Sequence, residues 1–179
     1  MISVAEAKRI IEENTTALQP AKLFLQQAAG KILAEDVYAT TDIPAFPQSS
    51  MDGYAFLFSE WKLNKKLIID GEIAAGDNEK ISLGTGKAVR IFTGAPVPPG
   101  ADTVIMQERV QINSNGSEKE LLIEDDVIKQ GNSVRPKGSE IQAGEMALEK
   151  NKFLSPAAVG FLAGIGVTEV EVYPNPSIS

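Results

Sequence analysis

The side chains best suited to chemistry lie in three short stretches, and the first surrounds Asp52. This aspartate stands beside a glycine in "FPQSSMDGYAFLF", residues 46–58, among apolar and small residues. Composition alone favours a turn, because Asp-Gly promotes tight turns and aspartate caps backbone amides. The alternative is a carboxylate displayed on a loop at the mouth of a barrel, with Met51, Tyr54 and Phe56 anchoring that loop.

The second stretch is the loop "TGAPVPPGADT", which begins at Thr93. Its three prolines fix φ, while Gly94 and Gly100 permit unusual backbone angles. Such a stiff loop could present the Thr93 hydroxyl and backbone N–H groups to an oxyanion. The alternative is a rigid connection between two strands. A P-loop is excluded, because the Gly-Lys-Ser/Thr sequence and the following helix are missing.

The third stretch, "GNSVRPKGSEI", places Arg135, Lys137 and Glu140 close together. Taken alone, it favours a solvated charged turn. As a site, Arg135 offers a planar fork for phosphate and Lys137 a point charge. Glu140 could accept a proton or help to hold Mg²⁺. The residue pattern does not show whether the three stretches meet.

Composition narrows the chemistry further. The chain of 179 residues is 43% hydrophobic and 23% charged, as ordinary globular proteins are, and it is long enough to bury a core. It has no histidine and no cysteine, which excludes histidine-paired nucleophiles, disulfides and most zinc sites. Proton transfer must therefore use carboxylate, lysine or tyrosine, and any metal would be a hard cation bound by oxygen, such as Mg²⁺.

Charge and hydropathy bear on partners and location. The net charge of −7 argues against a nucleic-acid surface, which requires a basic face. There is no apolar run long enough to span a membrane, and the N-terminus lacks the pattern of a secretory signal. The missing cysteines fit the cytosol. We expect a cytoplasmic protein that binds neither nucleic acid nor membrane.

The elements that must position these residues begin with a helix over 4–14, where Ser3 and Glu6 have capping-box spacing. Residues 22–28 predict an extended segment. A second short helix is expected within 26–36, weakened by Gly30, and then a strand within 36–43. Near the other end, Ser155 suits the N-cap of a helix and Pro156 its first position. A half-buried strand follows within 167–173.

Between 44 and 148 the pattern changes to short β-like runs divided by turns, including a hairpin with Asn115-Gly116 at its turn. Such spacing predicts a small barrel or sandwich. The helical segments at the two chain ends are each thin, so we expect them to pack together. The predicted fold is α+β with two domains. Residues 1–44 plus 147–179 form a discontinuous α/β domain for dimerisation, and 45–146 form an inserted β-barrel-like domain.

Long motifs give the chain a family resemblance. Four stretches carry it: "PAFPQSSMDGYAF" at 44–56, "AVRIFTGAPVPPGADTVIMQE" at 88–108, "GNSVRPKGSEIQAGE" at 131–145 and "LSPAAVGFLAGIGVTEVEVYPNPSIS" at 154–179. They closely resemble the N-terminal part of the MoeA and gephyrin E-domain family, the molybdopterin molybdenumtransferases. The resemblance covers the whole chain but only the first part of a family member. The final "SIS" after "YPNP" suggests a cut between domains.

The resemblance implies an activity. The family's enzyme takes adenylylated molybdopterin and molybdate, uses Mg²⁺, and releases AMP. Its members are elongated homodimers, with a cleft between the pterin-binding domain of one subunit and the barrel region of the other. That pterin-binding domain begins, in the family, with a Ser-Thr-Gly-Asp-Glu-Leu-like motif after the present end point. The chain alone is therefore expected to be inactive.

The resemblance also implies site residues. Asp52, Thr93 and Glu140 match catalytic positions, and Asp52 and Glu140 would help to hold the metal indirectly or jointly. Glu140 falls where many members have the aspartate of Gly-Glu-Asp, so its acid is one methylene longer and Ser139 replaces the preceding acid. The matching positions for substrate binding are Ser50, Met51, Gly53, Tyr54, Gly94, Arg135 and Lys137.

Two other functions remain open on the sequence. One is a non-catalytic dimerisation or scaffold module of a gephyrin-like protein, because the gephyrin branch uses a related domain to cluster receptors. The other is an unrelated carbohydrate- or metal-binding barrel, which the long motif matches disfavour.

Overall fold

The computed structural model describes residues 2–76, 82–124 and 127–176, so the suggested cut at 177–179 lies outside the described residues. Contacts between Cα atoms group the chain into two compact units, 1–41 with 143–179 and 42–142. We call these the discontinuous unit and the sheet unit. Compactness does not show that each unit folds alone, so the predicted domain division stays a prediction.

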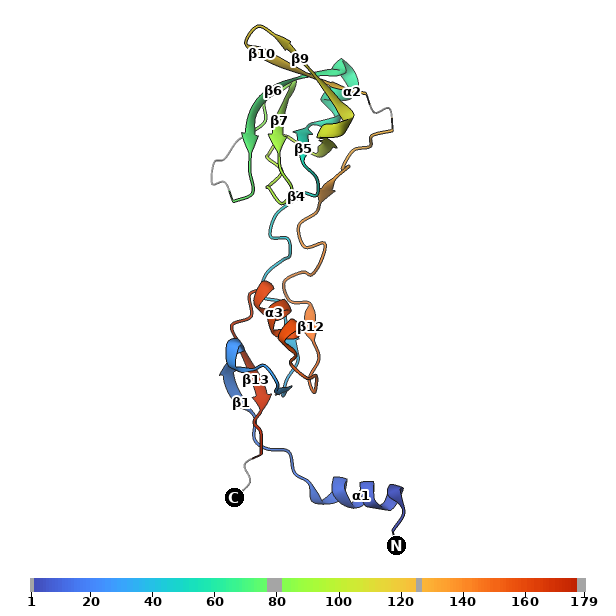
Figure 1. Ribbon diagram of the computed structural model, residues 1–179, viewed down its shortest axis with the longest axis vertical. Coiled ribbons are helices and arrows are strands. Elements are labelled where there is room, and N and C mark those ends of the chain that lie inside the picture. The colour runs from blue at the N-terminus through green and yellow to red at the C-terminus, as the bar shows by residue number, and fades with distance from the viewer. Residues whose placement is uncertain (1, 77–81, 125–126, 177–179) are drawn as a thin grey trace. The chain divides into compact units, whose positions relative to one another are not determined.

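The sheet unit is built on a curled six-stranded sheet, a half-barrel with strand order β8-β5-β7-β6-β10-β9 (Figure 1). Neighbouring strands are antiparallel except β6 and β7, which run parallel with an irregularity between Ile69 and Glu72. The chain is thus mixed α+β, as predicted. The strands are β5 (Gly53–Phe56), β6 (Lys66–Ile73), β7 (Lys87–Ile91), β8 (Thr103–Met106), β9 (Val110–Asn115) and β10 (Glu118–Ile123).

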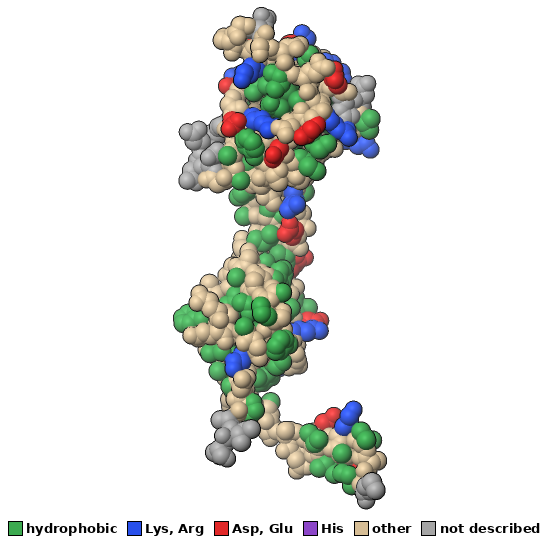
Figure 2. All heavy atoms as spheres, viewed as in Figure 1, with side chains coloured by type: hydrophobic (Ala, Val, Ile, Leu, Met, Phe, Trp, Pro, Cys, Tyr) green, Lys and Arg blue, Asp and Glu red, His purple; other side chains and the backbone are tan. Residues whose placement is uncertain are grey.

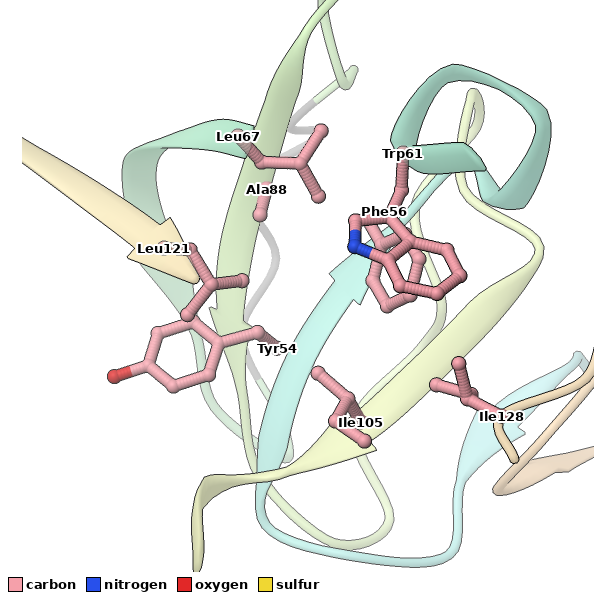
Figure 3. Close-up of a cluster of buried hydrophobic side chains, with 8 residues drawn as sticks. All are labelled: Tyr54, Phe56, Trp61, Leu67, Ala88, Ile105, Leu121 and Ile128. Carbon is pink, nitrogen blue, oxygen red and sulfur yellow. The ribbon is translucent and has the colours of Figure 1, made fainter. Parts of the chain in front are cut away.

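One hydrophobic cluster lies on one face of this sheet (Figure 3). Its aromatic centre joins Phe56 on β5 to Trp61 on helix α2 (Phe58–Asn64), with ring centroids 6.1 Å apart. The C-cap of α2 is Lys65, whose backbone is left-handed and whose Nζ lies 4.2 Å from the centre of the Trp61 ring. The cluster comprises Tyr54, Phe56, Trp61, Leu67, Ala88, Ile105, Leu121 and Ile128.

Neither α2 nor β5 was predicted, because the interpretation of 44–148 recognised only short runs separated by turns. The hairpin between β9 and β10 is confirmed, with its turn moved by one residue. Asn115 still pairs with Glu118 in the ladder, so the two turn residues are Gly116 and Ser117. Gly116 supplies the positive φ of 66° that this turn requires.

The discontinuous unit contains a three-stranded antiparallel sheet of order β1-β13-β2. The extended segment predicted at 22–28 is confirmed in part by β1 (Ala21–Phe24), and the last predicted strand by β13 (Glu169–Tyr173). Helix α3 (Pro156–Gly164) begins as predicted, since the Ser155 hydroxyl accepts a hydrogen bond from Ala158 N at 3.2 Å. Small strands β3 (Val37–Tyr38) and β12 (Met146–Leu148) pair beside this sheet.

The helix predicted within 26–36 is wrong. A single 3₁₀ turn, η1 (Leu25–Gln27), is followed by Gly30 at φ +80° and then by strand β2 (Ile32–Leu33). Positive φ at Gly30 ends any helical run. Leu33 is fully buried and pairs with Val172 of β13, so tertiary pairing decides the conformation here.

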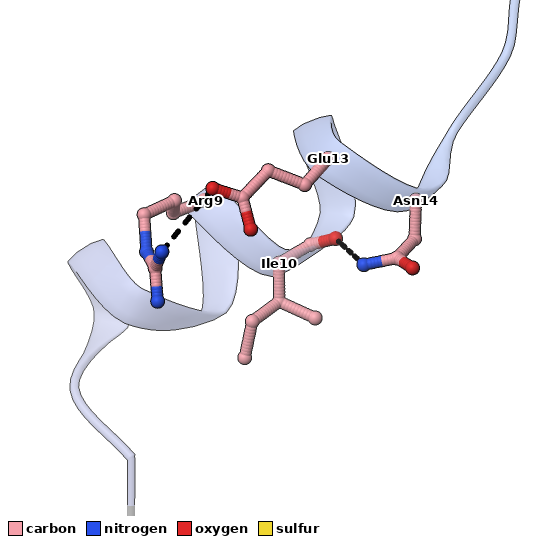
Figure 4. A network of polar contacts seen from close by, with 4 residues as sticks. All are labelled: Arg9, Ile10, Glu13 and Asn14. Atoms are coloured by element: carbon pink, nitrogen blue, oxygen red, sulfur yellow. Dashed lines mark hydrogen bonds and ion pairs between the residues drawn. The ribbon is translucent and has the colours of Figure 1, made fainter.

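Helix α1 (Val4–Asn14) has the predicted bounds, and the Ser3 hydroxyl caps it by accepting from Glu6 N at 3.2 Å. An Arg9–Glu13 ion pair of 3.2 Å and an Asn14 side-chain bond to Ile10 O tie its last turns together (Figure 4). None of its residues is buried, and hydrophobic side chains show on its surface (Figure 2). The packing expected between the helical segments of the chain ends is therefore not seen for α1.

Within the described ranges, none of the helices combines the length and apolar character needed to cross a membrane.

Candidate functional site around Asp52 and Thr93

Asp52 directly precedes β5, an interior strand of the curled sheet. The following residue must be glycine, because a Cβ on Gly53 would lie 1.9 Å from the Ile105 carbonyl oxygen of β8. Tyr54 and Phe56 are buried, but Met51 is 44% exposed, so only two of the three expected anchors hold the segment. The Asp-Gly pair therefore marks the start of a closely packed strand.

The Asp52 carboxylate is fixed by Thr93. Its Oδ1 accepts hydrogen bonds from Thr93 N at 2.8 Å and from Thr93 Oγ1 at 2.7 Å. The Asp52 backbone carbonyl accepts from Gln107 N at 3.1 Å. Among the described residues no hydrogen bond to Asp52 Oδ2 occurs, and both side chains are exposed to solvent. The carboxylate is therefore oriented and keeps one oxygen for a ligand.

These contacts also set the charge of the site. The pKa of Asp52 is lowered, first by the Thr93 backbone hydrogen bond and then by the Thr93 hydroxyl; desolvation opposes this, and the positive charge of Arg90 adds the smallest lowering effect. Hydrogen bonds to a carboxylate favour its ionised form. Asp52 is therefore an anion at neutral pH.

Arg90 on β7 is a site residue that the sequence interpretation missed. Its Nη1 donates to Gly53 O at 3.1 Å, and its Nη2 donates to Gln107 Oε1. Its guanidinium carbon lies 5.2 Å from the Tyr54 ring centre and 4.9 Å from that of Phe92. A single arginine inside the apolar run "AVRIF" was the signal that could have identified it.

The proline loop is tied to a short strand, β4 (Gln48–Ser49). Gly94, at φ +82°, donates its N–H to Ser49 O at 2.8 Å, and Ser49 N donates to Ala95 O at 3.0 Å. This attachment places Thr93 opposite Asp52. Both Thr93 donors are used by the carboxylate, so they do not form the open oxyanion site that the loop suggested.

The third stretch joins the other two through the backbone. Strand β11 (Val134–Arg135) pairs with β4, with Val134 opposite Ser49 and Arg135 opposite Gln48. Ser50 N and Ser50 Oγ both donate to Ser133 O, at 3.0 and 3.1 Å. The structure therefore brings all three stretches to one region of the sheet unit. Met51 and Ser133 also line a common cavity of about 290 Å³.

The charged side chains of the third stretch pair with one another or with Asp42 of the same chain. Glu140 Oε1 lies 2.9 Å from Arg135 Nη1, and Lys137 Nζ lies 3.1 Å from Asp42 Oδ2. Glu140 thus has Arg135, and not Asp52, as its partner. Over the described part of the chain no group of three or more acidic residues could hold a metal ion. The metal roles of Asp52 and Glu140 stay predictions.

Comparison with known proteins adds to this geometry. The family profile described as "MoeA N-terminal region (domain I and II)" matches residues 2–166. A molybdopterin molybdenumtransferase of Haemophilus influenzae is 33% identical over 174 residues, which are 97% of this chain and 42% of that protein. Another, from Nostoc, is 36% identical over 160 residues, 87% of this chain and 36% of the relative. The chain thus spans less than half the length of these relatives.

Solved structures agree. Two structures of a molybdopterin biosynthesis MoeA protein from Pyrococcus horikoshii superpose with TM-scores of 0.85 and 0.82, at 29% and 28% identity. Each comparison covers 98% of this chain, and 47% and 45% of the respective MoeA chain. The fold, the three linked stretches and the profile match converge, and the chain belongs to the MoeA N-terminal family.

Proposed function

We propose that this chain acts in molybdenum cofactor biosynthesis as the N-terminal part of a molybdopterin molybdenumtransferase. The reaction would transfer molybdate into adenylylated molybdopterin and release AMP. Family membership and the names of the relatives support this function. The observation that carries it is the Asp52 carboxylate, held ionised by Thr93 where three matched stretches meet.

Asp52 and Thr93 divide the proposed work between them. Thr93 orients the Asp52 carboxylate by donating two hydrogen bonds to Asp52 Oδ1, and these bonds lower the pKa of Asp52. Asp52 Oδ2 is left available to a ligand. Glu140 would add a second carboxylate once it leaves its exposed pairing with Arg135, and exposed pairs of this kind are weak. Arg135 and Lys137 would then meet the anionic substrate.

The carboxylate oxygens of Asp52 and Glu140 suit a Mg²⁺ ion that the protein would hold only in part. Mg²⁺ is commonly bound by one or two carboxylates together with substrate phosphates and water. Asp52 provides one such oxygen, and Glu140 would be the second. When bound, Mg²⁺ would neutralise negative charge on the nucleotide phosphate.

The remaining proposed substrate residues contribute in different ways. Ser50 and Met51 are partly or well exposed and can contact a ligand, whereas Gly53 and Tyr54 are buried. We assign the buried pair to shaping the site. Gly94 allows the loop bend that sets Thr93 in place.

We also propose that the two compact units are two domains and that the protein is a cytoplasmic homodimer. The absence of cysteine supports the location. Support for the homodimer comes from α1, whose apolar residues Val4 and Ile11 are 76% and 64% exposed. An eleven-residue helix is marginal in water without packing, so a second copy would cover this surface.

The decisive experiment replaces Asp52 by asparagine in the natural protein that carries this sequence. Asp52→Asn keeps the acceptor geometry but removes the charge, and we expect molybdenum insertion to fall by about a hundredfold, the usual effect of losing one electrostatic group. Asp70→Asn is the matched control, because Asp70 pairs with Lys87 on the same sheet. Product is measured as molybdenum cofactor formed, and the dimer by light scattering.

Wild-type insertion in Asp52→Asn would contradict the proposal and leave Asp52 a structural residue. A scaffold role would be favoured by that same outcome. We further expect the isolated 179-residue chain to insert no molybdenum, because its relatives are more than twice as long.

A further inference from the structure

Thr103, the first residue of β8, is a polar residue with no exposed surface. Among the described residues, Ser49 is the only other polar or charged residue that is buried to this degree. A buried hydroxyl is costly unless it is hydrogen-bonded, and it then holds its partners in one arrangement. The partners of Thr103 therefore show which part of the sheet unit it fixes.

The Thr103 hydroxyl forms a network with the neighbouring Asp102. Thr103 Oγ1 donates to Asp102 Oδ1 at 2.8 Å and accepts from Gly131 N at 3.1 Å. Asp102 Oδ1 also accepts from Phe58 N, in the first turn of α2, at 2.9 Å. Asp102 Oδ2 accepts from Gln130 Nε2 at 2.6 Å. The two side chains thus attach one later segment of the chain to β8 and to the start of α2.

The attached segment is the turn at 130–133, whose backbone is unusual. Gly131 has φ +81° and Ser133 has φ +53°. A left-handed backbone is unfavourable for serine, so it persists only where the surroundings hold it, and such residues concentrate at functional sites. A further bond from β8, Val104 N to Asn132 O at 2.9 Å, holds the turn in this form.

The turn connects the Asp52 segment to the third stretch. Ser133 O accepts both bonds donated by Ser50, which lies two residues before Asp52. The chain continues from the turn directly into β11 (Val134–Arg135) and then to Lys137. The place of these basic side chains beside Asp52 therefore depends on how firmly the turn is held.

We propose that Asp102 and Thr103 are positioning residues, which hold the turn at 130–133 so that the basic side chains of the third stretch meet the anionic substrate beside Asp52. This inference rests on the proposed transferase function. The pair acts through the turn and not on the reacting atoms. The Asp52–Thr93 hydrogen bonds do not pass through the turn, so loss of the pair should weaken substrate binding and leave the Asp52 carboxylate in its orientation.

Two adjacent amide groups give a direct test of the turn. Ser50 N donates to Ser133 O, whereas Ser49 N donates to Ala95 O in the proline loop. Thr103→Val keeps the shape of the side chain but removes the hydroxyl. In the natural protein that carries this sequence, labelled with ¹⁵N-serine, we expect hydrogen exchange at Ser50 to become about tenfold faster relative to exchange at Ser49, because the opening is local.

Steady-state kinetics of the same protein test the consequence for function. Thr103→Val should raise KM for adenylylated molybdopterin about tenfold and leave kcat within about twofold, as expected when substrate and transition state lose the same contact. Thr103→Ser retains the hydroxyl and should restore both KM and the exchange ratio. Leu67→Val, at a buried position of the same sheet, is the control for general destabilisation and should change neither.

An exposed variant gives the same test if Thr103→Val does not fold. Gln130→Glu puts a second carboxylate against Asp102, which should loosen the turn and shift both measurements in the same direction by about threefold. Gln111→Glu is the matched control. Gln111 is also exposed and donates to a carboxylate, that of Glu124, but it lies on β9 away from the turn.

The proposal is overturned if Thr103→Val speeds exchange at Ser49 and Ser50 equally, because Thr103 would then have only a general structural effect. It is also overturned if KM keeps its wild-type value or if Thr103→Ser behaves as Thr103→Val does. Wild-type insertion in Asp52→Asn would contradict the transferase proposal instead, and that result is independent of the exchange at Ser50.

Discussion

The curled sheet and helix α1 differ in where their stability originates. Phe56, Leu67, Ile105 and Leu121 of the sheet have at most 1% of their surface exposed, so the sheet is stabilised from within its own unit. α1 has two ordered ends and an ion pair but no buried residue. Capping and a local ion pair are thus sufficient to define a helix, whereas a stably packed structure also needs buried side chains.

This difference explains where the candidate site lies. Asp52 leads directly into β5, whose four residues are all buried. The direction of an exposed carboxylate is therefore determined by packing directly next to it in the chain. A comparable acid on α1, such as Glu13, has only an exposed arginine to hold it.

The strongest test of the contrast is a single methyl group placed on β5. Gly53→Ala would set a Cβ 1.9 Å from Ile105 O, so the strands must separate. We expect a loss of about 3 kcal/mol or more in the free energy of unfolding, at the upper end of overpacking effects, measured by urea denaturation. Gly160→Ala in α3 meets no atom within 4 Å, and it should stabilise by about 0.5–1 kcal/mol.

If Gly53→Ala leaves stability unchanged, β5 is not held as closely as the contrast requires.

A smaller effect on stability is expected from the exposed surface of α1. Ile11→Ser should change the free energy of unfolding of a single chain by less than about 0.5 kcal/mol, as exposed sites usually do. It should nevertheless shift the protein from dimer to monomer in light scattering, if a second copy covers this surface. Glu12→Ser, on the same helix, should leave the dimer intact. An unchanged dimer in Ile11→Ser would show that α1 is not the interface.

The smallest effect concerns protonation of Asp52. Thr93→Val removes the hydroxyl donor but retains the backbone donor, so the lowered pKa of Asp52 should rise part of the way toward its ordinary value. A carboxyl group whose pKa is lowered in the folded state stabilises that state at pH values above its unfolded-state pKa. This stabilisation is lost as the pH falls through the folded-state pKa. Carboxyl-carbon NMR titration measures the shift, and an identical titration curve in the variant would contradict the role assigned to the hydroxyl.

The sequence predicted those elements whose signals are local. Ser3 and Ser155 mark the starts of α1 and α3 because an N-cap needs only its own turn. Leu33 was misassigned to a helix because its strand exists only through pairing with Val172 on β13. β5 escaped notice for a similar reason, since "GYAF" carries no alternation and is buried on both faces.

The site was predictable in its parts but not in its assembly. The motifs identified Asp52 and Thr93, yet the hydrogen bonds between them join positions 41 residues apart. Ser50 and Ser133 meet across 83 residues. Arg90 was overlooked because an arginine within a strand has no spacing signal, and only the register that sets it opposite Tyr54 shows its place.

The burial of Trp61 has a spectroscopic consequence. It is the single tryptophan of the chain, 4% exposed, against Phe58 and beneath the Lys65 ammonium group. Its fluorescence, excited selectively, therefore reports on the 42–142 unit alone, while far-ultraviolet dichroism reports on the backbone of both. Melting curves that coincide for the two signals would indicate one cooperative transition. Separate curves would assign the tryptophan transition directly to the unit that bears Asp52.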